Sequence, residues 1–164
     1  MPAPEPVFDA ETIFRVLRQH GVDFVVIGGI AVQAHGYIRF TRDLDVIVRP
    51  SALNASRLSE ALAELKAELR APGALRLTDP HELRRAPLIP VMTAAGPLDV
   101  VHVEHIAGAP RSYDALREAA LVIEIDGGEV AVAGVSDLIR MKRAAGRDQD
   151  LADIEALTRD PEAT

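Results

Sequence analysis

Apolar side chains recur along the chain at two spacings, and each spacing predicts one kind of element. Spacings of three and four residues, with capping residues and glycine at their ends, predict helices at 10–20, 30–35, 52–69, 112–118, 136–146 and 148–157. Short runs rich in β-branched residues predict strands at 24–27, 43–48, 75–78, 88–93, 98–103, 121–125 and 129–133. The Asp126-Gly127-Gly128 turn predicts that the last two strands form a hairpin.

The order of these elements predicts the fold class. Helices and strands alternate at first, several strands then follow one another, and helices close the chain. This order is typical of an α+β fold, here with a central mixed β-sheet and helices packed mainly on one face. We expect one domain over 1–164, with loose termini at 1–7 and 160–164.

Composition narrows the class of protein. The chain has no cysteine, which excludes disulfides and thiolate metal sites. No stretch resembles a signal peptide, and no apolar run approaches the ~20 residues of a membrane span, so we expect a cytoplasmic protein without a membrane partner. The net charge of −7 predicts no overall attraction to nucleic acid.

Three carboxylates form the candidate site. Asp43 and Asp45 are two residues apart in one predicted strand, so their side chains share a face and lie about 6–7 Å apart. Asp99 opens an otherwise apolar strand, where an unpaired buried carboxylate would cost several kcal/mol. We expect the two strands to be neighbours. Three carboxylates at one edge of a sheet are a hard oxygen-ligand set for Mg²⁺.

Each of these features also has a simpler interpretation. Asp99 alone could be a residue at a strand edge after a turn. The Gly28-Gly29 pair could serve only to allow positive φ, rather than to let backbone N–H groups approach a phosphate. The carboxylates and the glycine turn are more informative together than any of them is alone.

The segment from Gly28-Gly29 to Thr41-Arg42-Asp43-Leu44-Asp45, followed by Asp99, resembles the signature of the DNA polymerase β-like nucleotidyltransferase superfamily. The Gly28–Ala31 run, Arg39 and the C-terminal segment from Lys142 to Ile154 look like the small bacterial AbiEii-type toxin branch of that superfamily. The resemblance spans about 25–157. Many members have Gly-Ser where this chain has Gly-Gly, so no hydroxyl is available there to bind phosphate.

The resemblance implies roles for individual residues. Asp43, Asp45 and Asp99 would bind two Mg²⁺ ions (Mn²⁺ is possible), and Asp99 would help take the acceptor's proton. Gly28 and Gly29 would cradle the phosphates of a nucleoside triphosphate (NTP). The cations that would neutralise it are Lys142, Arg147 and Arg42. Lys142 could instead end a solvated helix, and Arg147 could form a structural ion pair with Asp150 or Asp153.

These observations predict a metal-dependent nucleotidyltransferase that moves NMP from an NTP to tRNA, a protein or a small molecule. The toxin-like branch suggests a toxin–antitoxin or phage-defence role with an antitoxin partner, by analogy only. The alternatives are a non-catalytic nucleotide-binding or regulatory module of the same fold, and a structural interaction domain. The intact carboxylate triad argues against both alternatives.

Overall fold

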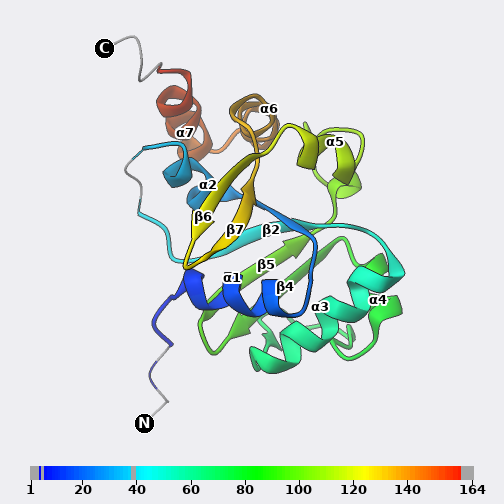
Figure 1. Cartoon of the computed structure of the whole chain (residues 1–164). Coiled ribbons are helices and arrows are strands. Elements are labelled where there is room, and N and C mark those ends of the chain that lie inside the picture. Colours follow the sequence, from blue (N-terminus) through cyan, green and yellow to red (C-terminus); the bar gives the residue numbers. More distant parts are fainter. Residues whose placement is uncertain (1–3, 5, 38–39, 160–164) are drawn as a thin grey trace.

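A computed structural model describes residues 4, 6–37 and 40–159 (Figure 1). The described part has an α+β fold, as predicted, built on one mixed sheet in the order β3-β4-β5-β2-β1-β7-β6. The strands are β1 (Phe24–Ile27), β2 (Leu44–Val48), β3 (Glu68–Leu69), β4 (Leu88–Thr93), β5 (Gly96–Val101), β6 (Leu121–Ile125) and β7 (Gly128–Val132). The helices are α1 (Ala10–Gln19), α2 (Gly28–Ala34), α3 (Ala52–Glu64), α4 (Pro80–Arg85), α5 (Tyr113–Glu118), α6 (Val135–Ala145) and α7 (Asp148–Thr158), with a 3₁₀ turn at Val103–His105.

The centre of the sheet sets the position of the candidate site. Strand β2 is antiparallel to β1 and parallel to β5, so it lies between them. In this register Asp45 is paired with Ile27 on one side and with Asp99 on the other. The two strands predicted to be neighbours are therefore neighbours, and their carboxylates lie side by side.

Strand alternation assigns one face of the central sheet to the main core. Leu44, Val46 and Val48 of β2 point to this face and are buried. Helices α1 and α3 cover it, and the Phe14 ring of α1 stacks on Phe24 of β1 with 6.1 Å between centroids. This continuous apolar layer supplies most of the burial that stabilises the fold.

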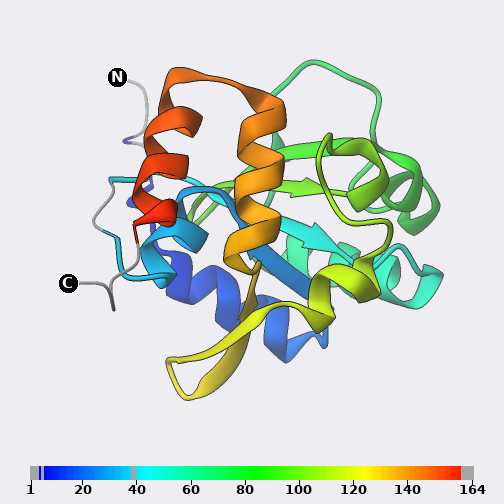
Figure 2. The same cartoon turned by 90° about the horizontal axis from the view of Figure 1, so that it is seen from above.

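The opposite face is only partly covered. Figures 1 and 2 show α6 and α7 on the side of the sheet away from α1 and α3. Leu138 and Met141 of α6 are buried there, while the acidic positions of β2 and β5 stay open to a cleft. Helix packing is thus complete under one face and leaves room for a site on the other.

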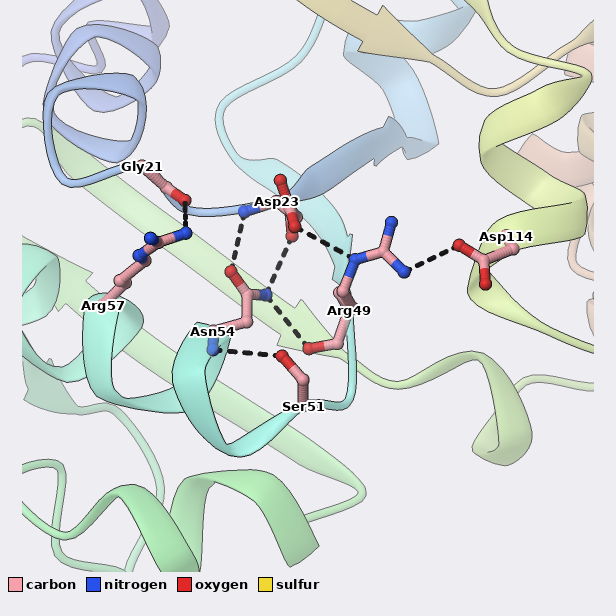
Figure 3. Close-up of polar contacts among 7 residues, drawn as sticks. All are labelled: Gly21, Asp23, Arg49, Ser51, Asn54, Arg57 and Asp114. Atoms are coloured by element: carbon pink, nitrogen blue, oxygen red, sulfur yellow. Dashed lines mark hydrogen bonds and ion pairs between the residues drawn. The ribbon is translucent and has the colours of Figure 1, made fainter.

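At the end of the β1–β2 pair away from Asp45, several polar residues are joined by hydrogen bonds and ion pairs (Figure 3). The buried Asn54 side chain accepts a hydrogen bond from the Asp23 N–H (2.7 Å) and donates to the Asp23 and Arg49 carbonyl oxygens (both 3.0 Å). Arg49 in turn pairs with Asp23 (3.0 Å) and Asp114 (2.7 Å). Asn54 therefore ties the start of β1 to the end of β2, in addition to the direct hydrogen bond from the Arg49 N–H to the Asp23 carbonyl oxygen (3.2 Å).

The helix predicted at 52–69 is confirmed up to Glu64 and wrong beyond it. Helix α3 ends at Glu64, because Lys66 adopts a left-handed conformation (φ 55°) that stops the helix. Glu68 and Leu69 then form β3, which pairs with Met92 and Val91 of β4. Backbone hydrogen bonds to a distant strand outweigh the local helical pattern here.

The segment around residues 75–86 also differs from the prediction. No strand forms at 75–78, and the chain instead enters α4. The Asp79 side chain accepts hydrogen bonds from the N–H groups of His81 and Glu82, and Pro80 fits the first helical position. The Asp79-Pro80 pair is a helix-start signal that can be recognised in the sequence.

Over the residues that the structure describes, none of the helices has the length and apolar character required to cross a membrane.

Candidate active site

A cleft of about 360 Å³ opens between α6 and the exposed face of the central strands. It brings together most of the residues predicted from the sequence, including all three carboxylates. The polar residues that line it are Gly28, Gly29, Asp43, Asp45, Asp99, Lys142, Arg147 and Asp150. Residues from five elements or their ends thus meet in one place.

Asp45 is the central group of the cleft. It lies between Ile27 of β1 and Asp99 of β5, and it shares a side-chain hydrogen bond with Asp99. Burial, the charges of Asp43 and Asp99 and this hydrogen bond raise the pKa of Asp45 to about 7, against the opposing charge of Lys142. Such crowding of carboxylates marks a place where a cation would be stabilising.

Asp99 is held from outside the cleft by Arg70, which sequence analysis did not single out. Burial raises the pKa of Asp99, and the Arg70 guanidinium opposes part of that rise. Arg70 forms an ion pair with Asp99, and its own N–H donates to the Pro90 carbonyl oxygen at 3.0 Å. No local pattern marks Arg70, because the contact depends on β3 lying beside β4.

Asp43 precedes β2 rather than belonging to it, and its loop is fixed by Thr41. The Thr41 hydroxyl donates to the Asp43 carbonyl oxygen at 3.2 Å and reaches the Asp43 carboxylate at 3.5 Å. The predicted spacing of Asp43 and Asp45 therefore places both in the cleft, although only Asp45 lies within the strand.

Gly28 allows the turn after β1 to approach Asp45. Its φ of +72° is a conformation that side chains disfavour, and a Cβ at this position would lie 2.3 Å from Asp45 Oδ2. The main chain of the Gly28-Gly29 turn consequently lies directly against the central carboxylate. The predicted approach of this turn to a phosphate stays a prediction.

Lys142 is buried in the cleft wall rather than exposed at a helix end. Its Nζ lies 2.8 Å from Asp153 Oδ2 and 3.7 Å from Asp150 Oδ1, both on α7. The simple interpretation of Lys142 as a solvated residue is therefore wrong. Two buried carboxylates fix the ammonium group in position beside Asp45.

The two predicted arginines differ in their placement. Arg147 lines the cleft and binds Asp150 (2.6 Å), which agrees with the predicted structural ion pair. Burial alone would raise the pKa of Asp150, but hydrogen bonds from the Arg147 side chain and backbone lower it on balance. Arg42 does not line the cleft, and its guanidinium lies over the Phe40 ring, 5.2 Å from the centroid. Arg39 falls outside the described residues.

The carboxylates are suitable metal ligands by chemistry but are not drawn together into a finished metal centre. Among the described residues, no three acidic or histidine side chains are gathered closely enough to hold an ion as they stand. Arg70 holds Asp99, and Asp45 and Asp99 share a hydrogen bond. The oxygen donors and the unfavourable crowding at Asp45 nonetheless fit a hard divalent cation.

Part of the cleft lining is apolar, which sequence analysis did not anticipate. Leu88 of β4, Val101 of β5 and Ile106 belong to it. Leu88 and Val101 are paired across β4 and β5, two positions along the strands from the Pro90–Asp99 pair. Their proximity depends on the strand register, so no single stretch of sequence contains the signal.

Solved structures with the same architecture are nucleotidyltransferases. The lincosamide antibiotic adenylyltransferase LnuA, bound to lincomycin, has a TM-score of 0.63 and 12% identity, covering 93% of this chain and 98% of its own. The antibiotic-resistance factor ANT(2″)-Ia has a TM-score of 0.58 and 11% identity, covering 90% and 82%. A nucleotidyltransferase-like protein from Paracoccidioides brasiliensis has a TM-score of 0.54 and 17% identity, covering 93% and 77%. At these identities the likeness shows the fold.

The fold is thus that of a nucleotidyltransferase. The chain belongs to the family described as nucleotidyltransferase of unknown function (DUF6036), whose model matches residues 8–158. No curated protein sequence matches the chain. The predicted superfamily is confirmed, whereas the AbiEii-type branch stays a prediction.

Proposed function

We propose that this protein is a metal-dependent nucleotidyltransferase that moves NMP from an NTP to an acceptor. The observation that carries the proposal is the meeting of Asp43, Asp45 and Asp99 with the Gly28-Gly29 turn in one cleft. Family membership supports nucleotidyl transfer in general. A non-catalytic binding module, the alternative interpretation, would have no need to keep three carboxylates crowded at one point.

Asp43, Asp45 and Asp99 would hold the metal, which we propose to be Mg²⁺ (two ions) or Mn²⁺. A divalent cation bound there supplies charge neutralisation for the phosphates and lowers the pKa of the acceptor hydroxyl. The crowding that raises the pKa of Asp45 is the feature of this chain that such a charge would relieve. Arg70 contacts Oδ1 of Asp99, so Oδ2 is the oxygen that Asp99 would offer to the metal.

The remaining cleft residues suit the nucleotide. The main-chain N–H groups of Gly28 and Gly29 would bind phosphate oxygens, since no side chain stands in front of them. Lys142, held by Asp150 and Asp153, would place a fixed positive charge beside the phosphates. Asp99 is the candidate to accept the proton from the attacking hydroxyl.

The acceptor proposed here is a small molecule. Two of the structurally similar proteins act on antibiotics or hold them, one with lincomycin bound and one with adenylyl-2″-tobramycin. The net charge of −7 also disfavours a large RNA acceptor. A toxin role with an antitoxin partner stays a prediction from resemblance, as does a tRNA or protein acceptor.

Calorimetry with each of the four NTPs and Mg²⁺ tests the proposal, using wild type and Asp45→Asn. We expect one or more NTPs to bind in the presence of Mg²⁺, EDTA to abolish binding, and Asp45→Asn to weaken it by about 100-fold or more because a charged ligand is lost. NTP binding that neither EDTA nor Asp45→Asn changes would rule out the proposed metal site. A folded protein that binds no NTP would favour the interaction-domain alternative.

A further inference from the structure

The strands on either side of Asp45 bring different groups to the cleft. The Gly28-Gly29 turn follows β1, and its main chain suits phosphate, while the buried Lys142 comes from α6. Leu88 of β4 and Val101 of β5 lie beyond Asp99, and Ile106 follows β5; the other apolar residues of the lining come from β1 and α6 and are Ile27, Leu138, Met141 and Ala145. The register of the sheet fixes this order, because Ile27, Asp45 and Asp99 are consecutive partners across β1, β2 and β5.

The chemistry of nucleotidyl transfer gives each side a role. The acceptor oxygen forms a bond to the α-phosphorus while the bond from that phosphorus to the bridging oxygen breaks. The hydroxyl proton leaves to a base, and pyrophosphate departs. Attack and departure are in line, so the acceptor must approach from the side opposite the pyrophosphate. If the Gly28-Gly29 turn and Lys142 bind the departing phosphates, the acceptor lies on the β5 side.

The β5 side is built as an apolar surface. Leu88 is 47% exposed although it is a large hydrophobic residue at the edge of a cleft. Val101 lies directly opposite it in the β4–β5 ladder. The segment that carries Ile106 is fixed on α6, because a Cβ on Gly108 would lie only 2.4 Å from the Arg140 carbonyl oxygen. A preformed apolar surface of this kind stabilises a ligand by burying the ligand's own apolar area.

We infer that Leu88, Val101 and Ile106 form the acceptor-binding side of the cleft, and that the acceptor is a small hydroxyl compound with an uncharged apolar body. The inference rests on the proposed function and names the class of its second substrate. The hydroxyl would lie beside Asp99, and the apolar body would cover the exposed Leu88 side chain.

The charges around the cleft disfavour the other acceptor classes. Among the described residues that line it, the cations Lys142 and Arg147 are both on the phosphate side and paired with acids of α7. Arg84 and Arg85 of α4 do not line the cleft, and Arg84 donates to the Pro50 carbonyl oxygen (3.1 Å). On the β5 side Arg70 is paired with Asp99, so these two opposite charges offset each other and favour neither a polyanion nor a polycation.

Nuclear magnetic resonance of the full chain with labelled Leu, Val and Ile methyl groups tests the inference. Three probes are added separately in the presence of MgCl₂: benzyl alcohol as an uncharged aromatic hydroxyl compound, tobramycin as a polycation and a single-stranded RNA dodecamer as a polyanion. We expect benzyl alcohol at millimolar concentration to shift the methyl resonances of Leu88, Val101 and Ile106. The methyl groups of Leu151, which is 55% exposed on α7, serve as the control and should not move.

Substitution of Leu88 sharpens the test. Leu88→Thr introduces a β-branched, more polar residue that is suited to a strand, and Leu88→Asp adds a charge at a half-exposed position. We expect each to weaken benzyl alcohol binding, Leu88→Asp by about tenfold or more, since the buried apolar contact is lost. Benzyl alcohol that leaves the three residues unshifted, or stronger shifts there with tobramycin or RNA, would overturn the inference.

The proposed function is measured separately in the same samples. Addition of NTP and MgCl₂ should shift the amide resonances of Gly28 and Gly29. If these amides respond and the methyl groups do not respond to benzyl alcohol, the acceptor inference alone fails. If the methyl groups respond and the amides do not, the apolar ligand site stands and the proposed transfer reaction fails.

Discussion

The polar groups at the two ends of the β1–β2 pair differ in how well the protein itself stabilises them. At one end Asn54 satisfies the backbone of Asp23 and Arg49 with three hydrogen bonds (Figure 3). At the other end Asp45 lies among carboxylates, and its pKa rises to about 7. The first arrangement stabilises the folded state, and the second destabilises it in the absence of a cation. Polar residues that stabilise the fold are therefore distinguished from polar residues of a ligand site by whether other groups of the protein supply their hydrogen bonds and counter-charges.

Removal of Asn54 should give the largest change in stability. Asn54→Ala removes the side-chain partners of the Asp23 N–H and of the Arg49 carbonyl oxygen, and we expect the free energy of unfolding to fall by about 3 kcal/mol. Urea denaturation measures this loss. Arg57→Ala is the matched control on the same helix, since Arg57 donates one exposed hydrogen bond to the Gly21 carbonyl oxygen (3.3 Å). Equal losses of stability in the two variants would show that the Asn54 hydrogen bonds contribute no more than the exposed Arg57 hydrogen bond.

At the other end of the β1–β2 pair, Gly28→Ala should weaken ligand binding in the cleft more than it lowers the stability of the fold. The new methyl group must displace the Asp45 carboxylate, and we expect affinity for Mg²⁺–NTP to fall by about 30-fold, or about 2 kcal/mol. Calorimetry measures the affinity. Gly127→Ala is the matched control, because Gly127 has a similar φ of +75° but open space around its Cβ position. If both variants bind NTP alike, the contact with Asp45 does not matter.

The crowding at Asp45 should make stability depend on pH in the metal-free protein. The folded state raises the pKa of Asp45 from 3.8 to about 7, so between these values it holds a proton that the unfolded state has lost. Stability should therefore fall as the pH rises through this window, by about 1 kcal/mol between pH 6 and 7. Denaturation in EDTA measures it. Asp45→Asn should flatten the curve, and an unchanged slope in that variant would assign the effect to another group.

The smallest effect on stability is expected for Arg49, a partly exposed residue at the same end of the β1–β2 pair as Asn54. Arg49 contacts Asp23 and Asp114 and lies over the Tyr113 ring, 4.7 Å from its centroid. We expect Arg49→Lys to cost about 0.5–1 kcal/mol, because lysine lacks the planar fork that reaches both acids. Arg159→Lys, at a fully surface pair with Glu155, is the control and should cost less. Thermal denaturation at low and high salt compares them.

The sequence predicted elements whose signals are local. Asp9 caps α1, with its side chain accepting from the Thr12 N–H (3.2 Å). The Asp126-Gly127 turn joins β6 and β7, and Ser112 caps α5. In each case the residues that determine the structure are neighbours in the chain, so hydrogen-bonding chemistry and backbone conformation can be judged from the sequence alone.

What the sequence did not predict depends on distant partners. The end of the helix predicted at 52–69 forms β3 instead, because it pairs with β4. Arg70 reached Asp99 for the same reason, and the apolar surface at Leu88 and Val101 exists only through strand register. The three carboxylates were predictable because burial of charge is unfavourable wherever it occurs. Their roles in catalysis stay predictions.

The parallel pairing of β2 with β5 has a consequence for how the protein is made. Asp45 and Asp99 become neighbours only when strands roughly 50 residues apart have paired, a contact that requires a long loop to close. Lys142 lies on α6, later in the sequence than either carboxylate and after the β7 strand that pairs with β1. The groups of the cleft are therefore synthesised far apart, and each contact between them depends on a long-range pairing. Partly folded molecules that lack these pairings should be unable to bind the nucleotide.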